Sequence, residues 1–96
     1  MKSALLVIDM QEGFRYPLTE KIIPNVKKLV HHFGKNTVFI VFKNKKGSEF
    51  EKRLGWKKFQ KASERKILQE LGESHLTIKH TTYDVLTPAL LRYFLK

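Results

Sequence analysis

The chain has 96 residues, of which 42% are hydrophobic, and it carries 19 lysine and arginine residues against 9 aspartate and glutamate residues. This size and composition predict one small globular domain, residues 1–96, and exclude a disordered chain. The absence of cysteine excludes disulfides, thiolate metal sites and a cysteine nucleophile within this chain. No apolar run approaches the roughly 18 residues of a membrane span, and the N-terminus lacks the pattern of a signal peptide. We therefore expect a cytoplasmic protein without a membrane partner.

The first part of the chain alternates strand and helix patterns. An unbroken apolar run at residues 4–8 predicts a strand buried on both faces, as in a parallel sheet. Residues 12–18 contain a glycine and a proline and predict a loop. Apolar residues spaced by three and four predict a helix over residues 22–33, in which Pro24 fits only the first turn. β-Branched and aromatic residues predict a second strand at residues 37–42.

The second part continues the alternation less regularly. Residues 43–47 are polar, and the lysine-rich stretch 50–59 predicts irregular or weakly helical structure. Ser63 is the predicted N-cap of a helix that runs to residue 71. A short strand follows at residues 75–79, and the Thr87-Pro88 pair predicts the start of a last helix.

This order of elements predicts the fold class. Strands that alternate with helices indicate parallel strands joined by right-handed crossovers. We therefore expect an α/β, Rossmann-like, three-layer fold with a parallel sheet of about three strands. One edge of so small a sheet would need covering.

Two charged residues end predicted strands and are the candidate catalytic groups. Asp9 closes the first strand and Lys79 closes the third. The carboxyl ends of parallel strands meet at one edge, so the two side chains could project into one crevice as proton acceptor and cationic stabiliser. A structural ion pair, or an aspartate that accepts hydrogen bonds from loop amides, is the competing interpretation.

Five segments in chain order carry a resemblance to a known family. The chain resembles the first half of the isochorismatase-like cysteine hydrolases, a superfamily that includes nicotinamidases and isochorismatases. The matching segments are residues 6–14 (LVIDMQEGF), 23–25 (IPN), 38–42 (VFIVF), 55–56 (GW) and 78–90 (IKHTTYDVLTPAL).

The resemblance implies a function and a set of site residues. Relatives hydrolyse small-molecule amides or vinyl ethers. Asp9 would be the general base that activates a cysteine thiol, and Lys79 would hold the thiolate and the developing charge. Phe14 would be a wall of the substrate pocket, with Gln11 and Trp56 as further candidates for substrate binding.

The chain departs from this family in length and in its nucleophile. Relatives are longer, and their cysteine lies in a second half that follows a fourth strand. We therefore expect no hydrolysis from this chain alone. The first strand lies in the middle of the family's sheet, so its open edge would pair with a second polypeptide that supplies the missing half, or with another copy in a homo-oligomer.

The histidines do not form a recognisable metal site. Nicotinamidases carry an aspartate and two histidines after the second strand, and residues 42–48 contain neither residue type. His31 and His32 are neighbours on a predicted helix and point in different directions. His80 could line the crevice beside Lys79, although a polar loop residue is the favoured interpretation. We expect neither a metal nor another cofactor.

Two other functions compete with the hydrolase interpretation. Lysines interleaved with Phe50, Trp56 and Phe59 suit a module that binds nucleic acid or another polyanion. No named nucleic-acid motif is present, and packing of these aromatic side chains onto the sheet is the favoured alternative. The third interpretation is a purely structural, self-associating remnant of a hydrolase.

Overall fold

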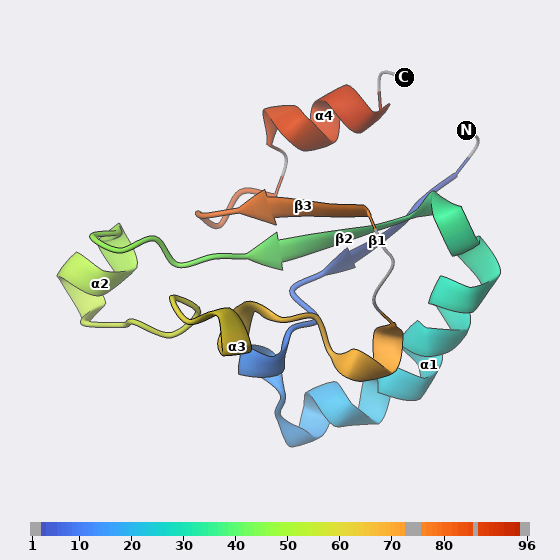
Figure 1. Ribbon diagram of the computed structural model, residues 1–96, viewed down its shortest axis with the longest axis horizontal. Coiled ribbons are helices and arrows are strands. Elements are labelled where there is room, and N and C mark those ends of the chain that lie inside the picture. Colours follow the sequence, from blue (N-terminus) through green and yellow to red (C-terminus); the bar gives the residue numbers. More distant parts are fainter. Residues whose placement is uncertain (1–2, 73–75, 86, 95–96) are drawn as a thin grey trace.

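The strands form one parallel sheet in a computed structural model that describes residues 3–72, 76–85 and 87–94. In this part of the chain β1 (Leu5–Ile8), β2 (Thr37–Phe42) and β3 (Leu76–His80) lie in the order β1-β2-β3, and both pairs are parallel. Figure 1 shows the three arrows pointing the same way. The predicted α/β class is confirmed.

Helices cover both faces of this sheet. Figure 1 shows α4 on one side, α1, α3 and the turn before β3 on the other, and α2 beyond the carboxyl ends of the strands. The helices and 3-10 turns are η1 (Glu12–Phe14), α1 (Pro17–Phe33), η2 (Gly34–Asn36), α2 (Glu49–Leu54), α3 (Ala62–Arg65), η3 (Gln69–Leu71) and α4 (Pro88–Phe94). No helix in the described ranges is long and apolar enough to cross a membrane.

The start of α1 differs from the prediction. The helix begins at Pro17, which occupies its first turn, and Pro24 lies inside it. An interior proline removes one backbone hydrogen bond and normally weakens a helix. Ile23 and Val30 are buried against the sheet, and this packing of the apolar face keeps the helix continuous through Pro24.

The predicted helix at residues 63–71 is right only over residues 63–65. α3 has Lys61 at its N-cap position, without a side-chain hydrogen bond, and ends at Arg65. Residues 66–68 are extended because their backbone pairs with residues 10–12: the N–H of residue 12 donates to the carbonyl oxygen of residue 66 (2.7 Å), and that of residue 68 to the carbonyl oxygen of residue 10 (3.0 Å). Long-range backbone hydrogen bonds thus replace the helical ones.

The remaining elements follow the sequence with small shifts. Ser48 accepts a hydrogen bond from the N–H of Glu51 (3.2 Å) and caps α2, which Gly55 ends with a φ of 63°. Thr87 precedes α4, as predicted. β3 ends at His80 rather than at Lys79, and this shift of one residue matters for the site.

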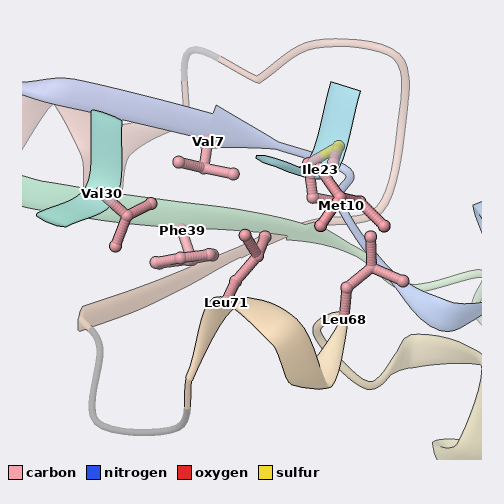
Figure 2. Close-up of a cluster of buried hydrophobic side chains, with 7 residues drawn as sticks. All are labelled: Val7, Met10, Ile23, Val30, Phe39, Leu68 and Leu71. Carbon is pink, nitrogen blue, oxygen red and sulfur yellow. The ribbon is translucent and has the colours of Figure 1, made fainter. Parts of the chain in front are cut away.

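Two apolar clusters hold the layers together. Figure 2 shows the larger one, in which side chains of the sheet and the loop after β1 meet those of α1 and the η3 turn. Its buried members are Val7, Met10, Ile23, Val30, Phe39, Leu68 and Leu71. On the other face, Leu90 of α4 packs against Val38 and Ile40 of β2.

Burial differs between the strands. Every residue of β2 is buried, as expected for the middle of a parallel sheet. In β1 only Val7 is buried, and Ile8 is 42% exposed. The expected burial of the first strand on both faces is therefore wrong in the described part of the chain, where β1 pairs only with β2.

Gly13 sits where a side chain would collide with the core. A Cβ atom there would lie 2.5 Å from Cζ of Phe59 and 3.0 Å from the carbonyl oxygen of Glu64. Phe59 is fully buried, so it has little room to move.

We expect Gly13→Ala to lower the free energy of unfolding by about 1–3 kcal/mol, measured by urea denaturation. In a Phe59→Leu background, Gly13→Ala should lower the free energy of unfolding by less than it does in the wild type. Equal losses in the two backgrounds would contradict the clash.

Arg15 ties three segments together through carboxylates. Its guanidinium lies 2.9 Å from Glu12, 2.6 Å from Glu70 and 3.4 Å from Glu20. Hydrogen bonds from Arg15 lower the pKa of Glu70 from its ordinary value of 4.5 to about 2, and they also lower the pKa of Glu12. This cluster links η1 to α1 and η3.

The Arg15 cluster predicts an acid-sensitive part of the stability. A carboxyl group whose pKa is lowered on folding stabilises the protein above its ordinary pKa of 4.5, and this contribution is lost as the pH falls toward about 2. Urea denaturation should show Glu70→Gln less stable than wild type at pH 6, with the difference shrinking between pH 4.5 and 2. A difference that stays constant over this range would contradict the assignment.

Candidate functional site

Asp9 ends β1 in an unusual backbone conformation. Its φ is 59°, in the left-handed region, where aspartate is one of the few residues that are tolerated. Its N–H still donates to the carbonyl oxygen of Ile40 (2.9 Å). The chain therefore leaves the sheet abruptly at Asp9, and the carboxylate reaches the end of β3.

His80 is the partner of this carboxylate. Nε2 of His80 lies 2.7 Å from Oδ1 of Asp9, and Nδ1 lies 2.7 Å from the carbonyl oxygen of Thr82. The side chain of His80 is 4% exposed and that of Asp9 is 34% exposed. The imidazole is thus fixed at both nitrogens, while the carboxylate keeps access to solvent.

The hydrogen bonds of His80 orient its ring against Asp9. A carbonyl oxygen can only accept, so Nδ1 donates to Thr82. Nε2 and Oδ1 are within hydrogen-bond distance of each other, so the imidazole holds the carboxylate in place.

A cavity of about 580 Å³ opens over the Asp9–His80 pair. Its walls are mainly aromatic: Phe42 stacks on Trp56 with 6.1 Å between ring centroids, and Phe50 meets Tyr83 edge to face at 5.2 Å. The lining residues are Ile8, Asp9, Phe14, Phe42, Phe50, Leu54, Trp56, His80, Thr82, Tyr83 and Val85. An apolar cavity with a few convergent polar groups is typical of a small-molecule site.

Three of the five predicted site residues meet in this cavity. Asp9, Phe14 and Trp56 all line it. Gln11 does not, because its fully buried side chain bonds to backbone: Nε2 donates to the carbonyl oxygens of Phe42 and Arg65 (both 2.9 Å), and Oε1 accepts from the N–H of Phe42 (2.8 Å). The structure therefore gives Gln11 a structural role and does not place it against a ligand in this cavity.

Lys79 lies on the opposite face of the sheet from His80. Successive residues of a strand point to opposite faces, and Lys79 lines a separate cavity together with Val41 and Thr77. The expected placement of Asp9 and Lys79 in one crevice is therefore wrong. The catalytic role that the resemblance implies for Lys79 stays a prediction.

His80 is the residue that the sequence interpretation undervalued. It is a buried strand residue, not a polar loop residue. The alternation in residues 76–80 could have indicated this, because His80 shares a face with apolar Ile78 while Lys79 shares a face with polar Thr77. A later strand end would have placed His80 on the buried face, but its contact with Asp9 also depends on the left-handed φ of Asp9, because the register alone puts Asp9 level with Lys79.

The polar groups of the cavity support proton transfer. The hydrogen-bonding side chains that line it are those of Asp9, His80, Thr82, Tyr83 and Trp56. Over residues 3–72, 76–85 and 87–94, no three His, Cys, Asp or Glu side chains cluster in a way that could hold a metal ion. The chemistry that this arrangement offers is acid–base exchange beside an apolar wall.

Comparisons with known proteins agree on the architecture. A family model described as the isochorismatase domain matches residues 3–94. The solved structure of N-carbamoylsarcosine amidase from Thermoplasma acidophilum is 18% identical, with a TM-score of 0.80, and the match covers 98% of this chain and 62% of that one. An isochorismatase-like hydrolase from Alkaliphilus metalliredigens is 20% identical, with a TM-score of 0.76, and the match covers 99% of this chain and 60% of that one.

These matches bear on the fold and on its extent. At such identities the two solved structures show that the fold is shared. The chain spans about three fifths of the length of both. Among curated proteins, none matches this sequence.

Proposed function

The chain belongs to the isochorismatase family, and from that premise we propose that the Asp9–His80 cavity binds a small organic molecule and supplies the acid–base group of a hydrolase site. The observation that carries the proposal is the hydrogen-bonded pair at the base of an aromatic cavity. Its position at the carboxyl ends of parallel strands is where open α/β sheets place their ligands.

Each residue has a role in this proposal. Asp9 accepts a hydrogen bond or a proton from the ligand, because its carboxylate is the more exposed member of the pair. His80 positions that carboxylate and shares its proton. Phe14 and Trp56 form the walls against which a flat ligand packs.

The substrate class follows from the walls and the polar base. A flat apolar molecule that carries an amide fits both, since an amide N–H can donate to Asp9. One of the similar structures is named as an amidase, so amides are the first compounds to test. Vinyl ethers, the other class suggested by the resemblance, lack this donor and rank second.

The nucleophile would have to come from outside this sequence. The 96 residues include no cysteine, so we propose that they do not hydrolyse an amide by thiol chemistry on their own. The backbone edge of β1 that has no strand partner in the described residues is where we propose that a strand of another polypeptide adds.

Trp56 gives a direct test of ligand binding. It is the one tryptophan of the chain and lines the cavity, so its fluorescence should change saturably on titration with benzamide. Asp9→Asn should weaken binding about threefold to tenfold, since it replaces a carboxylate acceptor. Asp84→Asn, at an exposed position, is the matched control and should bind as wild type. A wild-type protein without a saturable change at millimolar benzamide would refute the proposal.

The β1 edge is tested separately by solution mass. We expect light scattering to show a complex, either with a second polypeptide or between copies. A substitution of Leu6 by proline in β1 should reduce the mass, because proline blocks strand addition. Since this change can also weaken pairing with β2, Leu5→Lys is a second variant that charges the strand and leaves its amides. A monomeric wild-type protein at all concentrations would contradict strand addition.

A further inference from the structure

Lys79 lies among cations on the face of the sheet away from Asp9. It lines a cavity of about 500 Å³ with three other basic side chains, those of Lys43, Arg65 and Lys66. The rest of the lining is apolar or hydroxylic, and no aspartate or glutamate belongs to it. The wall of this cavity is almost entirely apolar, so the stems of these basic side chains form it and their charged ends do not face into it.

The basic surface extends beyond this cavity. A neighbouring hollow of about 570 Å³ shares Lys43 and Arg65 and adds Lys45 and Lys46, again without an acidic residue. The two hollows therefore form one stretch, which we name the basic groove. Its cationic side chains are Lys43, Lys45, Lys46, Arg65, Lys66 and Lys79.

The nearby carboxylates are engaged elsewhere. Glu49 pairs with Arg53 (2.6 Å), Glu51 accepts from the N–H of Gly47 (2.7 Å), and Glu64 accepts from the N–H of Phe59 (3.2 Å). Over the described ranges, the ion pairs involve Arg15, Arg53 and His80 and no lysine. The lysines of the basic groove therefore have no close ion pair in this part of the chain, and Glu51 offsets part of the charge of Lys46: the pKa of Glu51 is lowered by the N–H of Gly47, by the side chain of Gln60 and by the charges of Lys57 and Lys46.

We propose that the basic groove binds the sugar–phosphate backbone of single-stranded nucleic acid. The cations come from three segments, the stretch after β2, the end of α3 with the residue after it, and β3, and they are spread over two neighbouring hollows and not gathered at one point. A row of phosphates matches such a spread better than one phosphate ion does. The groove is recessed, which favours a flexible single strand over a rigid duplex.

This mode of binding is independent of base sequence. The aromatic side chains expected to stack with bases are elsewhere: Phe50 and Trp56 line the Asp9 cavity, and Phe59 is fully buried. Contacts to phosphates without base stacking give affinity that depends on salt and not on sequence. The groove and the Asp9 cavity lie on opposite faces of β3, so this proposal does not rest on the proposed hydrolase site.

The test is fluorescence anisotropy with a labelled oligothymidylate of about 20 nucleotides, titrated at several salt concentrations. Six phosphate contacts to a single strand predict a slope of log affinity against log salt of up to about −4. The triple variant Lys43→Gln, Lys66→Gln, Lys79→Gln should lose about tenfold or more in affinity and flatten this slope by about 2.

A control with the same change in net charge separates the groove from general electrostatics. Lys21, Lys27 and Lys28 are exposed on α1, and their replacement by glutamine should cost less than about threefold in affinity. Equal losses in the two triple variants would overturn the proposal.

Two measurements on the wild-type protein also test the single-strand site. Tighter binding of a duplex of equal length would refute it. Polyglutamate that competes with the oligothymidylate as well as unlabelled oligothymidylate does would refute it too.

Discussion

Replacing Gln11 by alanine is expected to lower the free energy of unfolding by about 3 kcal/mol or more. The side chain is fully buried and makes three hydrogen bonds to the backbone, two with Phe42 and one with Arg65. Without the Gln11 side chain, the buried N–H and carbonyl oxygen of Phe42 each lose a hydrogen-bond partner. Each buried polar group left unpaired in this way costs about 1–3 kcal/mol. Urea denaturation followed by far-UV circular dichroism measures the change.

Two further variants define what Gln11 contributes. Gln11→Glu should be at least as damaging as alanine, because a carboxylate cannot donate to the two carbonyl oxygens. Gln69→Ala, at an exposed position of the same residue type, should change stability by less than about 0.5 kcal/mol. If Gln11→Ala and Gln69→Ala proved equally mild, the hydrogen-bonded arrangement of Gln11 would be wrong.

The second large effect is the energetic coupling between Asp9 and His80. A double-mutant cycle with Asp9→Asn and His80→Gln should give a coupling energy of about 1.5–3 kcal/mol, the range for a hydrogen bond to a charged group. Asparagine is also tolerated at a positive φ, so Asp9→Asn removes the charge without changing the backbone requirement. Stability in urea is the readout.

The cycle distinguishes His80 from Lys79 as the partner of Asp9. The parallel cycle with Lys79→Gln should be additive within about 0.3–0.5 kcal/mol, since Lys79 lines the other face of the sheet. A strong coupling of Asp9 to Lys79 together with none to His80 would contradict the structure and restore the arrangement expected from the sequence. The same variants can be compared in the benzamide titration, where Lys79→Gln should bind as wild type.

The two faces of β3 thus support two separate proposals. His80 on one face belongs to an aromatic cavity with Asp9, and Lys79 on the other belongs to the basic groove. Substitutions in the basic groove should leave the benzamide titration unchanged, and Asp9→Asn should leave oligonucleotide affinity unchanged. Failure of one proposal would therefore not be mistaken for failure of the other.

Local patterns in the sequence determined the order of elements and the parallel sheet. The apolar run before Asp9 and the β-branched run at residues 37–42 are strands, and the amphipathic spacing of Val30 and its neighbours is a helix. These features depend on side-chain periodicity over a few residues, which is present in the sequence itself. The position of Asp9 at the carboxyl end of β1 follows from the same local information.

Contacts between distant segments decided the rest. Pairing with residues 10–12 made residues 66–68 extended where their own pattern favoured a helix, and packing on the sheet kept α1 helical through Pro24. The end of β3 was decided by its register with β2, in which His80 is opposite Phe42. His80 and Lys79 point to opposite faces because side chains in a strand alternate, and the left-handed φ of Asp9 turns its carboxylate away from the face of Lys79 and toward His80.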